Sequence, residues 1–320
     1  MSIGEGLRTP RVLRTPDVLF SALPDFGLAP HYCEVSDPDV PGGTLRMHYL
    51  DEGDPDAPVV LLLHGEPTWS YLYRKVIPVL VDAGLRVVAP DHIGFGRSDK
   101  LTVGTAYSFA RHIGWLRECL ARLDLRDVTL VGQDWGGPIG MGALAAEPDR
   151  FARVVAANTM LHTVDPALAG RLKFTLHGVG ESDACLSEGL LNWVTYSQRE
   201  PDFRASTAVR GMAQQPLDET VAAAYDAPFP DEPHKAGMRQ FPILIPLTRS
   251  DPGAAINRKT WRVLEGFDRP FLTAFSDRDP GTAGWAEIFR ERVPGAVGQP
   301  HITIEGAGHF LQEDQGEVLG

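Results

Sequence analysis

One stretch of the sequence places an acidic side chain where a nucleophile could be presented. Residues 130–137 read LVGQDWGG, so an apolar strand pattern ends in a G-x-D-x-G turn that runs directly into a helix pattern. Such a turn projects one side chain from a strained bend, and Gly132 and Gly136 leave room beside it. The projecting residue is Asp134 where serine is usual, which predicts a carboxylate nucleophile. The alternative is an aspartate that only caps the following helix.

A candidate base lies near the C-terminus, in the glycine-rich segment GAGHF at residues 306–310. Histidine is suited to proton transfer near neutral pH, and His309 follows a strand pattern. It also comes last in the chain order nucleophile, acid, base. We therefore interpret His309 as the base and the other nine of the ten histidines as structural.

The acid that would orient this histidine has two candidates in the loop after residue 275, Asp277 and Asp279. We prefer Asp279, because the acid in such a loop commonly sits just before a proline-rich or helical turn, and Pro280 follows it. A second possible location, at the end of the preceding strand pattern, holds Asn158. Its neutral amide cannot stabilise an imidazolium as a carboxylate does.

An oxyanion hole is predicted from the segment HGEPTW at residues 64–69, which also follows an apolar strand pattern. In enzymes with a nucleophile on a strand–turn–helix elbow, a loop of this kind supplies one backbone N–H, and the residue after the nucleophile supplies another. The donors would be the N–H groups of Glu66 and Trp135. Pro67 has no N–H to offer.

These segments need a framework, and the sequence predicts an α/β fold for it. Strand patterns alternate with helix patterns, and several strand patterns are continuous apolar runs, which is typical of a mostly parallel, doubly wound sheet. The expected strands are 45–50, 59–64, 86–89, 128–132, 154–157, 271–275 and 302–304, and the expected helices are 70–83, 108–123, 136–146 and 283–293.

The alternation stops after Asn158 and resumes near Arg269, across a stretch rich in proline, tryptophan and short helix patterns. Ligands of open α/β sheets bind beyond the carboxyl ends of the strands, so an insertion that emerges there would cover the site. We expect a helical cap at residues 161–241, inserted after the sixth strand of the fold, and a core formed by residues 1–160 and 242–320.

Composition narrows the classes of partner. Acidic residues outnumber basic ones by 42 to 30, which argues against nucleic acid or a polybasic membrane surface as a partner. The longest apolar run is too short to span a bilayer, and the N-terminus lacks the apolar core of a signal peptide, so we expect a soluble, cytoplasmic protein. The three cysteines, Cys33, Cys119 and Cys185, are expected to be reduced and structural.

Taken together, the motifs resemble the haloalkane dehalogenases of the α/β-hydrolase superfamily, and the likeness runs from about Tyr49 to the C-terminus. Glu66, Asn158 and Asp279 fit the subgroup that has an Asp-His-Asp triad and a Glu-Trp oxyanion pair. The segments that carry the resemblance are HGEPTWSYLYRK (64–75), APDHIGFGRSDK (89–100), VGQDWGG (131–137), DAPFPDEPHKAGMRQFP (226–242) and AGHFLQE (307–313).

The resemblance implies that two indole N–H groups hold the departing halide, one beside the nucleophile and one in the cap. The first maps onto Trp135. The second maps onto Trp193 in the cap segment LLNWV (190–194), where the alternative is a tryptophan that only packs in the core.

Relatives usually continue into a closing helix after the base, but only eleven residues follow His309, so the resemblance implies a shortened C-terminus without that helix.

A haloalkane presents a tetrahedral carbon, on which serine would form an ether that water cannot readily cleave, whereas a carboxylate forms a cleavable ester. The resemblance therefore implies a detoxifying enzyme that takes a small haloalkane and water and releases alcohol, halide and a proton. No metal, flavin or nucleotide is required, and no P-loop or G-x-G-x-x-G motif follows a strand, so we expect no cofactor. We expect a monomer or small homo-oligomer.

Two other functions compete with this one. An epoxide hydrolase shares the aspartate elbow and uses two cap tyrosines as acids, for which Tyr196 and Tyr225 are the candidates, but HGEPTW lacks the aromatic residue usual after His-Gly in those enzymes. A binding protein that kept the fold and lost its chemistry is the second alternative. Halide release from a short haloalkane would separate all three.

Overall fold

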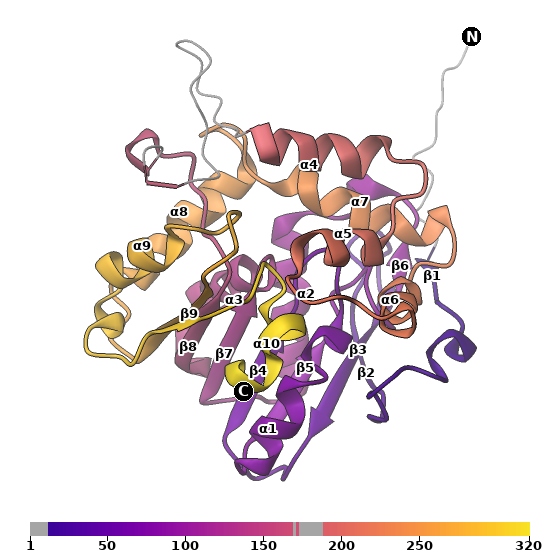
Figure 1. The fold of residues 1–320 in the computed structure, drawn as a ribbon, viewed down its shortest axis with the longest axis horizontal. Coiled ribbons are helices and arrows are strands. Elements are labelled where there is room, and N and C mark those ends of the chain that lie inside the picture. Colours follow the sequence, from indigo (N-terminus) through magenta and orange to yellow (C-terminus); the bar gives the residue numbers. More distant parts are fainter. Residues whose placement is uncertain (1–11, 169–170, 173–187) are drawn as a thin grey trace.

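The computed structural model describes residues 12–168, 171–172 and 188–320, and it is built around an eight-stranded sheet (Figure 1). The strand order is β10-β9-β8-β7-β4-β5-β3-β2, in which β10 through β5 run parallel and β3 is antiparallel to both its neighbours. The strands are β2 (His31–Ser36), β3 (Thr44–Glu52), β4 (Val59–Leu63), β5 (Arg86–Pro90), β7 (Val128–Gln133), β8 (Phe151–Ala157), β9 (Phe271–Ser276) and β10 (Ile302–Ile304).

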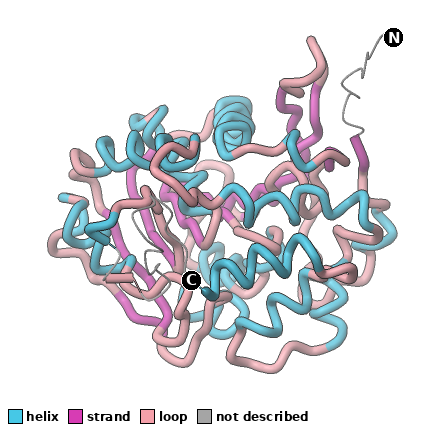
Figure 2. The backbone as a smooth tube through the Cα atoms, turned by 90° about the horizontal axis from the view of Figure 1, so that it is seen from above, coloured by secondary structure: helices cyan, strands magenta, loops and turns pink. Residues whose placement is uncertain are grey.

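Helices flank this sheet on both sides (Figure 2). On one side α2 (Phe109–Arg122), α3 (Gly136–Ala146) and α8 (Pro252–Leu264) pack against one another, and α9 (Trp285–Arg292) lies against α8 through the stacked rings of Trp261 and Phe289. On the other side α1 (Val76–Asp82) packs against α10 (Leu311–Leu319). Because both faces are covered, all five residues of β4 are buried, and the predicted α/β class with a mostly parallel sheet is confirmed.

The segment between β8 and β9 is helical and contains no strand among its described residues. Its helices before α8 are α4 (Glu188–Arg199), α5 (Ala205–Met212), α6 (Glu219–Asp226) and α7 (Ala236–Gln240). Figure 1 shows α4 across the top of the molecule with α5 and α7 beneath it. These helices lie where the sequence predicted a cap.

Three expectations about elements need correction. The expected helix 70–83 is a short 3-10 turn at Ser70–Tyr73 followed by α1. A continuous helix would need an N–H from Pro78 to the carbonyl of Arg74, and the proline ring would clash with that carbonyl. The closing helix is not missing, because α10 begins two residues after His309.

The third correction is a strand that the sequence analysis missed, β2. Within the described part of the chain it pairs with β3 alone, and buried residues alternate with more exposed ones along it, with Cys33 and Val35 facing inward. A half-solvated antiparallel strand has no continuous apolar run, which is the pattern that predicted buried strands such as β4. A separate two-stranded ribbon, β1 (Val12–Leu13) with β6 (Lys100–Leu101), was missed as well.

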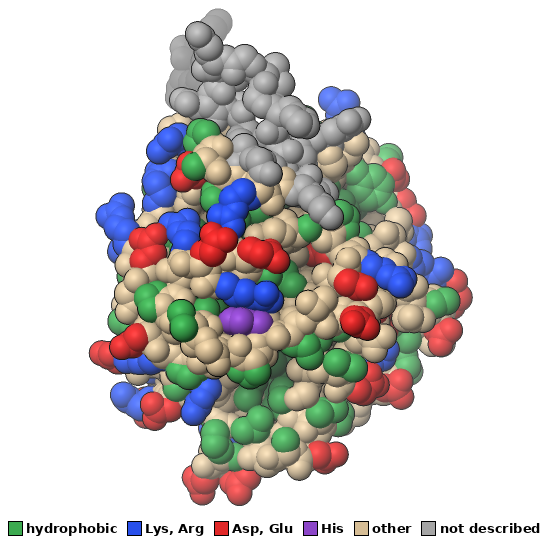
Figure 3. Space-filling view, turned by 60° about the vertical axis from the view of Figure 1, so that its left-hand side comes forward, with side chains coloured by type: hydrophobic (Ala, Val, Ile, Leu, Met, Phe, Trp, Pro, Cys, Tyr) green, Lys and Arg blue, Asp and Glu red, His purple; other side chains and the backbone are tan. Residues whose placement is uncertain are grey.

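The distribution of surface charge and the state of the described cysteines are those of an ordinary globular protein. Acidic and basic side chains are interspersed over the face in Figure 3. Cys33 and Cys119 are buried free thiols whose sulfur atoms lie 3.2 Å apart, whereas Cys185 lies outside the described residues. None of the described helices has the length and apolar character needed to cross a bilayer.

Candidate active site

The turn between β7 and α3 presents Asp134 in a strained conformation. Its φ of 47° is in the left-handed region, which residues with a Cβ rarely adopt. The turn is held from β8, since the Asp134 N–H donates to the Asn158 carbonyl at 3.0 Å and the Thr159 hydroxyl donates to the Asp134 carbonyl at 2.7 Å. A Cβ on Gly132 would lie 2.7 Å from the Cα of Gly137, so the close packing predicted for this turn is present.

The loop after β4 reaches the same carboxylate. The Glu66 N–H donates to Asp134 Oδ1 at 2.8 Å, and a Cβ on Gly65 would overlap that oxygen. The backbone N–H of Trp135 has no acceptor among the described residues, so it is not bonded to Asp134 in this state. One of the two predicted oxyanion donors is therefore already engaged, and the other is free.

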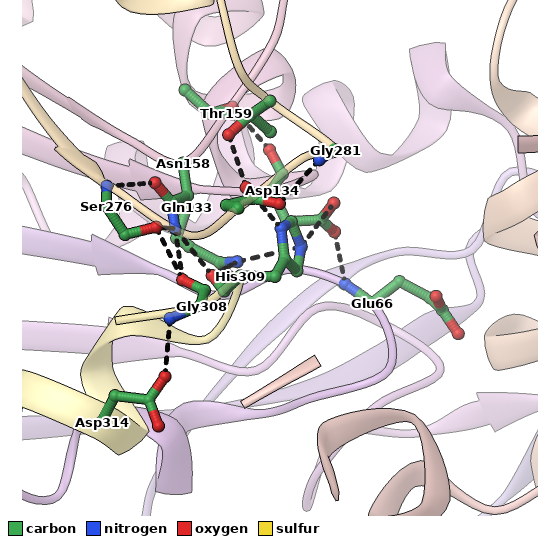
Figure 4. A network of polar contacts seen from close by, with 12 residues as sticks. Glu66, Gln133, Asp134, Asn158, Thr159, Ser276, Gly281, Gly308, His309 and Asp314 are labelled. Carbon is green, nitrogen blue, oxygen red and sulfur yellow. Dashed lines mark hydrogen bonds and ion pairs between the residues drawn. The ribbon is translucent and has the colours of Figure 1, made fainter. Parts of the chain in front are cut away.

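His309 lies between two carboxylates (Figure 4). Its Nδ1 is 2.9 Å from Asp279 Oδ2, and its Nε2 is 3.5 Å from Asp134 Oδ2. Burial lowers the pKa of His309, but the charge of Asp279 and the proximity of Asp134 outweigh burial and raise that pKa above its ordinary value. Two negative neighbours thus favour the imidazolium while Asp134 is ionised.

The two candidate acids have different surroundings. Asp279 is buried, and it also accepts hydrogen bonds from the Gly281 N–H at 2.8 Å and the Thr282 hydroxyl at 2.5 Å. Burial would raise the pKa of Asp279, but His309 and these donors lower it below its ordinary value. Asp277 instead accepts the Gly306 N–H. The structure therefore places Asp279, rather than Asp277, against the histidine.

Amide side chains at the strand ends position the histidine loop, and the sequence analysis missed this role. Asn158 Nδ2 donates to the carbonyls of Gly308 and His309 at 2.8 and 3.0 Å, and Asn158 Oδ1 accepts the Ser276 N–H. Gln133 Nε2 also donates to the His309 carbonyl at 3.2 Å. Asn158, which the sequence analysis rejected as the triad acid, therefore links β8 and β9 to the loop of the candidate base through hydrogen bonds.

A cavity of about 680 Å³ opens above these residues. Asp134, Glu66, His309 and Asp279 lie on its core side, and Trp193, Tyr196 and Met212 line it from the helical segment. The pKa of the Glu66 carboxyl is raised well above its ordinary value, because the side chain is buried and Asp134 is close, so the neutral form is favoured. A volume of this size accommodates a small organic substrate.

The six tryptophans divide into two groups of three. Trp69, Trp115 and Trp261 donate their indole N–H groups to backbone carbonyls. The other three indole N–H groups have no acceptor among the described residues, and all three side chains line the cavity: Trp135, Trp193 and Trp285. Trp285, on α9, was not singled out in the sequence, because nothing local to residue 285 indicates that its ring faces the cavity.

The two tyrosines required by the epoxide hydrolase alternative are not equivalent. Tyr196 lines the cavity. Tyr225 is buried, and its hydroxyl donates to Glu313 Oε2 at 2.7 Å, outside the set of cavity-lining residues. That hydroxyl already donates to a carboxylate, so the described residues that line the cavity do not include the pair of tyrosine acids needed for epoxide opening.

No group of three or more potential metal ligands occurs among the described residues. The side chains that offer chemistry at the site are a carboxylate on a strained elbow, a histidine paired with a second carboxylate, and indole donors that face a cavity.

The fold and its elbow define an α/β hydrolase, and a family model described as alpha/beta hydrolase fold matches residues 58–179. The chain is 49% identical over 309 residues to a haloalkane dehalogenase of Psychrobacter cryohalolentis, covering 97% of this chain and 95% of that protein. It is 46% identical to haloalkane dehalogenase 1 of Mycobacterium tuberculosis, with 96% of each covered.

A solved structure agrees with these relatives. The tetrameric haloalkane dehalogenase DpaA from Paraglaciecola agarilytica superposes with a TM-score of 0.81 at 35% identity, covering 95% of this chain and 94% of that one. The chain therefore belongs to the haloalkane dehalogenase family, hydrolases that act on carbon–halogen bonds, as the sequence predicted.

Proposed function

We propose that this enzyme hydrolyses small haloalkanes through an alkyl-enzyme ester and that Asp134 is the nucleophile. An oxygen of Asp134 attacks the carbon that bears the halogen, the carbon–oxygen bond forms, and the carbon–halogen bond breaks with its electron pair leaving on the halide. Trp135 and Trp193 donate indole N–H bonds to the developing anion. Two observations support this role of Trp135 and Trp193: both rings line the cavity, and neither indole N–H has an acceptor among the described residues.

The second step is ester hydrolysis with His309 as base. Esterification removes the negative charge of Asp134, one of the two charges that raise the pKa of His309. The pKa of the imidazolium then falls, so His309 releases its proton to solvent. The neutral ring can then take a proton from water as the water attacks the ester carbonyl. Asp279 orients and stabilises the imidazolium, and the N–H groups of Glu66 and Trp135 stabilise the oxyanion. The alcohol leaves, and Asp134 is restored as a carboxylate beside the protonated His309, so that each turnover releases one halide, one alcohol and one proton.

One observation carries this proposal. The two carboxylate oxygens of Asp134 have different partners. Oδ1 accepts a hydrogen bond from the Glu66 N–H at 2.8 Å, and Oδ2 lies 3.5 Å from His309 Nε2. Each oxygen therefore faces a different part of the machinery, one the oxyanion donor and the other the base. An aspartate that merely capped α3 would have its side chain on the N–H groups of that helix, and no such bond is present among the described residues.

Isotope labelling tests the ester intermediate. In a single turnover of 1-bromobutane in water enriched in ¹⁸O, the alcohol should carry unlabelled oxygen from Asp134, and the label should appear in the peptide that contains Asp134. Label in the alcohol of the first turnover would instead indicate direct attack by water. Styrene oxide serves as the comparison substrate, and its hydrolysis without bromide release from 1-bromobutane would favour the epoxide hydrolase alternative.

The remaining assignments are proposals as well. We propose that residues 161–241 form the cap and that residues 1–160 and 242–320 form the core, which is supported by the all-helical character of the described part between β8 and α8. A cytoplasmic location and a role in detoxification remain predictions from sequence and resemblance. For the predicted monomer or small homo-oligomer, the tetrameric DpaA supports the oligomer, and light scattering would decide.

A further inference from the structure

The turn that follows α5 crosses directly over the loop that carries His309. The His309 N–H donates to the Met212 carbonyl at 3.0 Å. At Gly308 a Cβ would overlap that same carbonyl oxygen, so the two backbones are in contact. Gly211, Met212 and Gln214 also line the cavity. One short cap segment, residues 211–215, thus contacts both the substrate cavity and the backbone of the candidate base.

The carboxylate of Asp314 in the first turn of α10 holds these two backbones together. Its Oδ1 accepts the N–H groups of Gln214 and Gln215, both at 2.8 Å. Its Oδ2 accepts the Gly308 N–H at 2.8 Å, the contact drawn in Figure 4. Hydrogen bonds to an ionised acceptor are about twice as strong as neutral ones. A single side chain therefore joins two segments that are separated by more than ninety residues.

The helix that presents Asp314 is itself firmly anchored through the preceding residue. Glu313 is buried and forms a two-pronged ion pair with Arg74, with distances of 2.6 and 2.8 Å. It also accepts the Tyr225 hydroxyl from α6. Because its neighbour is fixed to both the core and the helical segment, Asp314 has little freedom to follow either partner if one of them moves.

We propose that Asp314 is a positioning residue that couples the cap segment 211–215 to the base, keeping His309 aligned for ester hydrolysis. This proposal rests on the role proposed for His309 above. Asp279 fixes the ring through Nδ1, and Asn158 fixes the loop through its carbonyls. Asp314 acts on the opposite, N–H side of the same loop, the side that faces the cap.

The coupling predicts which step of the reaction depends on Asp314. Halide displacement requires Asp134 and the indole donors, whereas ester hydrolysis requires a correctly placed imidazole. In Asp314→Asn, one of the two acceptor oxygens becomes an N–H₂ donor that faces backbone N–H groups, so either the cap side or the Gly308 side of the junction is lost. Ester hydrolysis should then slow by about tenfold, the scale expected for one hydrogen bond to a charged group.

The experiment is a rapid-quench reaction of 1-bromobutane with the full chain. Asp314→Asn should release one bromide per enzyme at close to the unsubstituted rate and then turn over about tenfold more slowly. Intact-mass measurement should show the alkyl-enzyme accumulating. His309→Gln is the reference for complete arrest at the ester. Asp277→Asn is the matched control, because Asp277 also accepts an N–H of this loop, from Gly306, and has no hydrogen bond to the cap segment.

The outcomes separate the two proposals. If His309→Gln accumulates no ester, the proposed mechanism fails and the coupling fails with it. If His309→Gln accumulates ester while Asp314→Asn slows both steps equally, slows neither, or behaves like Asp277→Asn, then only the coupling is overturned. Should Asp314→Asn not fold, Asp314→Glu keeps the charge but displaces it by one methylene, and it is judged by the same criteria.

Discussion

The two sides of the cavity are built in different ways. We call the core side, with Asp134, Glu66, His309 and Asp279, the floor, and the side formed by the helical segment, with Trp193, the roof. On the floor, Asp134 is held through both its backbone groups, and Asp279 accepts three hydrogen bonds. On the roof, Trp193 is only partly buried and is held by ring contacts with Tyr196 and Phe203 at 6.0 and 5.8 Å between centroids. Its indole N–H has no acceptor among the described residues.

This difference predicts how substitutions on each side of the cavity should affect the reaction. Directional hydrogen bonds fix the reacting atoms on the floor, where small displacements are costly to the chemistry. Ring packing on the roof is less directional than hydrogen bonding, so it fixes the position of Trp193 less strictly. Substitutions on the floor should therefore abolish a step of the reaction, whereas substitutions on the roof should reduce a rate or an affinity.

The largest effect is expected for Asp134→Asn, which should abolish turnover. An amide oxygen is a poor nucleophile, and its alkylation would not yield a simple ester. Bromide release from 1-bromobutane, measured on freshly purified protein, is the readout. More than a trace of activity would contradict the proposed nucleophile.

His309→Gln should stop turnover but preserve the first step, because nothing remains to activate water. Intact protein should become heavier by one alkyl group, and peptide mapping should locate that group on Asp134. A modified peptide from elsewhere in the chain, or an unmodified protein that still releases one bromide, would require a different intermediate.

Asp279→Asn should lower the turnover rate strongly, up to roughly 10⁴-fold, the scale seen when the acid of a Ser-His-Asp triad is neutralised. The loss arises because the amide cannot stabilise the imidazolium and can favour the wrong tautomer. Asp277→Asn is the control for the loop and should have little effect. The reverse ranking would assign the acid to Asp277 and leave the rest of the floor unchanged.

Trp193→Phe should have the smallest effect of this series, on the roof. The substitution keeps much of the apolar volume and removes one donor to a charged acceptor, which is worth roughly 1.5–3 kcal/mol, or about ten- to a hundredfold in halide affinity or in the rate of displacement. Halide quenching of tryptophan fluorescence measures the affinity directly.

Two matched variants make the test of Trp193 decisive. Trp135→Phe should show a loss of similar size if both indoles bind halide. Trp285→Phe, at the third cavity tryptophan without an indole acceptor, should change halide affinity little. If Trp285→Phe lowers the affinity and Trp193→Phe does not, the second donor belongs to α9 rather than to the cap.

Part of this site could be predicted because its signals are local. The LVGQDWGG run contains the strand, the turn and the start of the helix that together project Asp134, and Pro280 marks the turn beside Asp279. The structure brings both carboxylates to His309, although their catalytic roles remain predictions. Other residues carry no such signal, since Asn158 looked like a missing acid until its bonds to the carbonyls of Gly308 and His309 were visible.

The sequence by itself determined the α/β class, the family and the chain positions of the candidate nucleophile, acid and base, because apolar periodicity and glycine-bounded turns are properties of short segments. Only the tertiary structure decided that α10 closes the core, that Trp285 faces the cavity, and that Asp314 joins the cap segment to the base loop. Each of these depends on contacts between segments far apart in the chain. Packing sets such contacts, and no single window of residues encodes them.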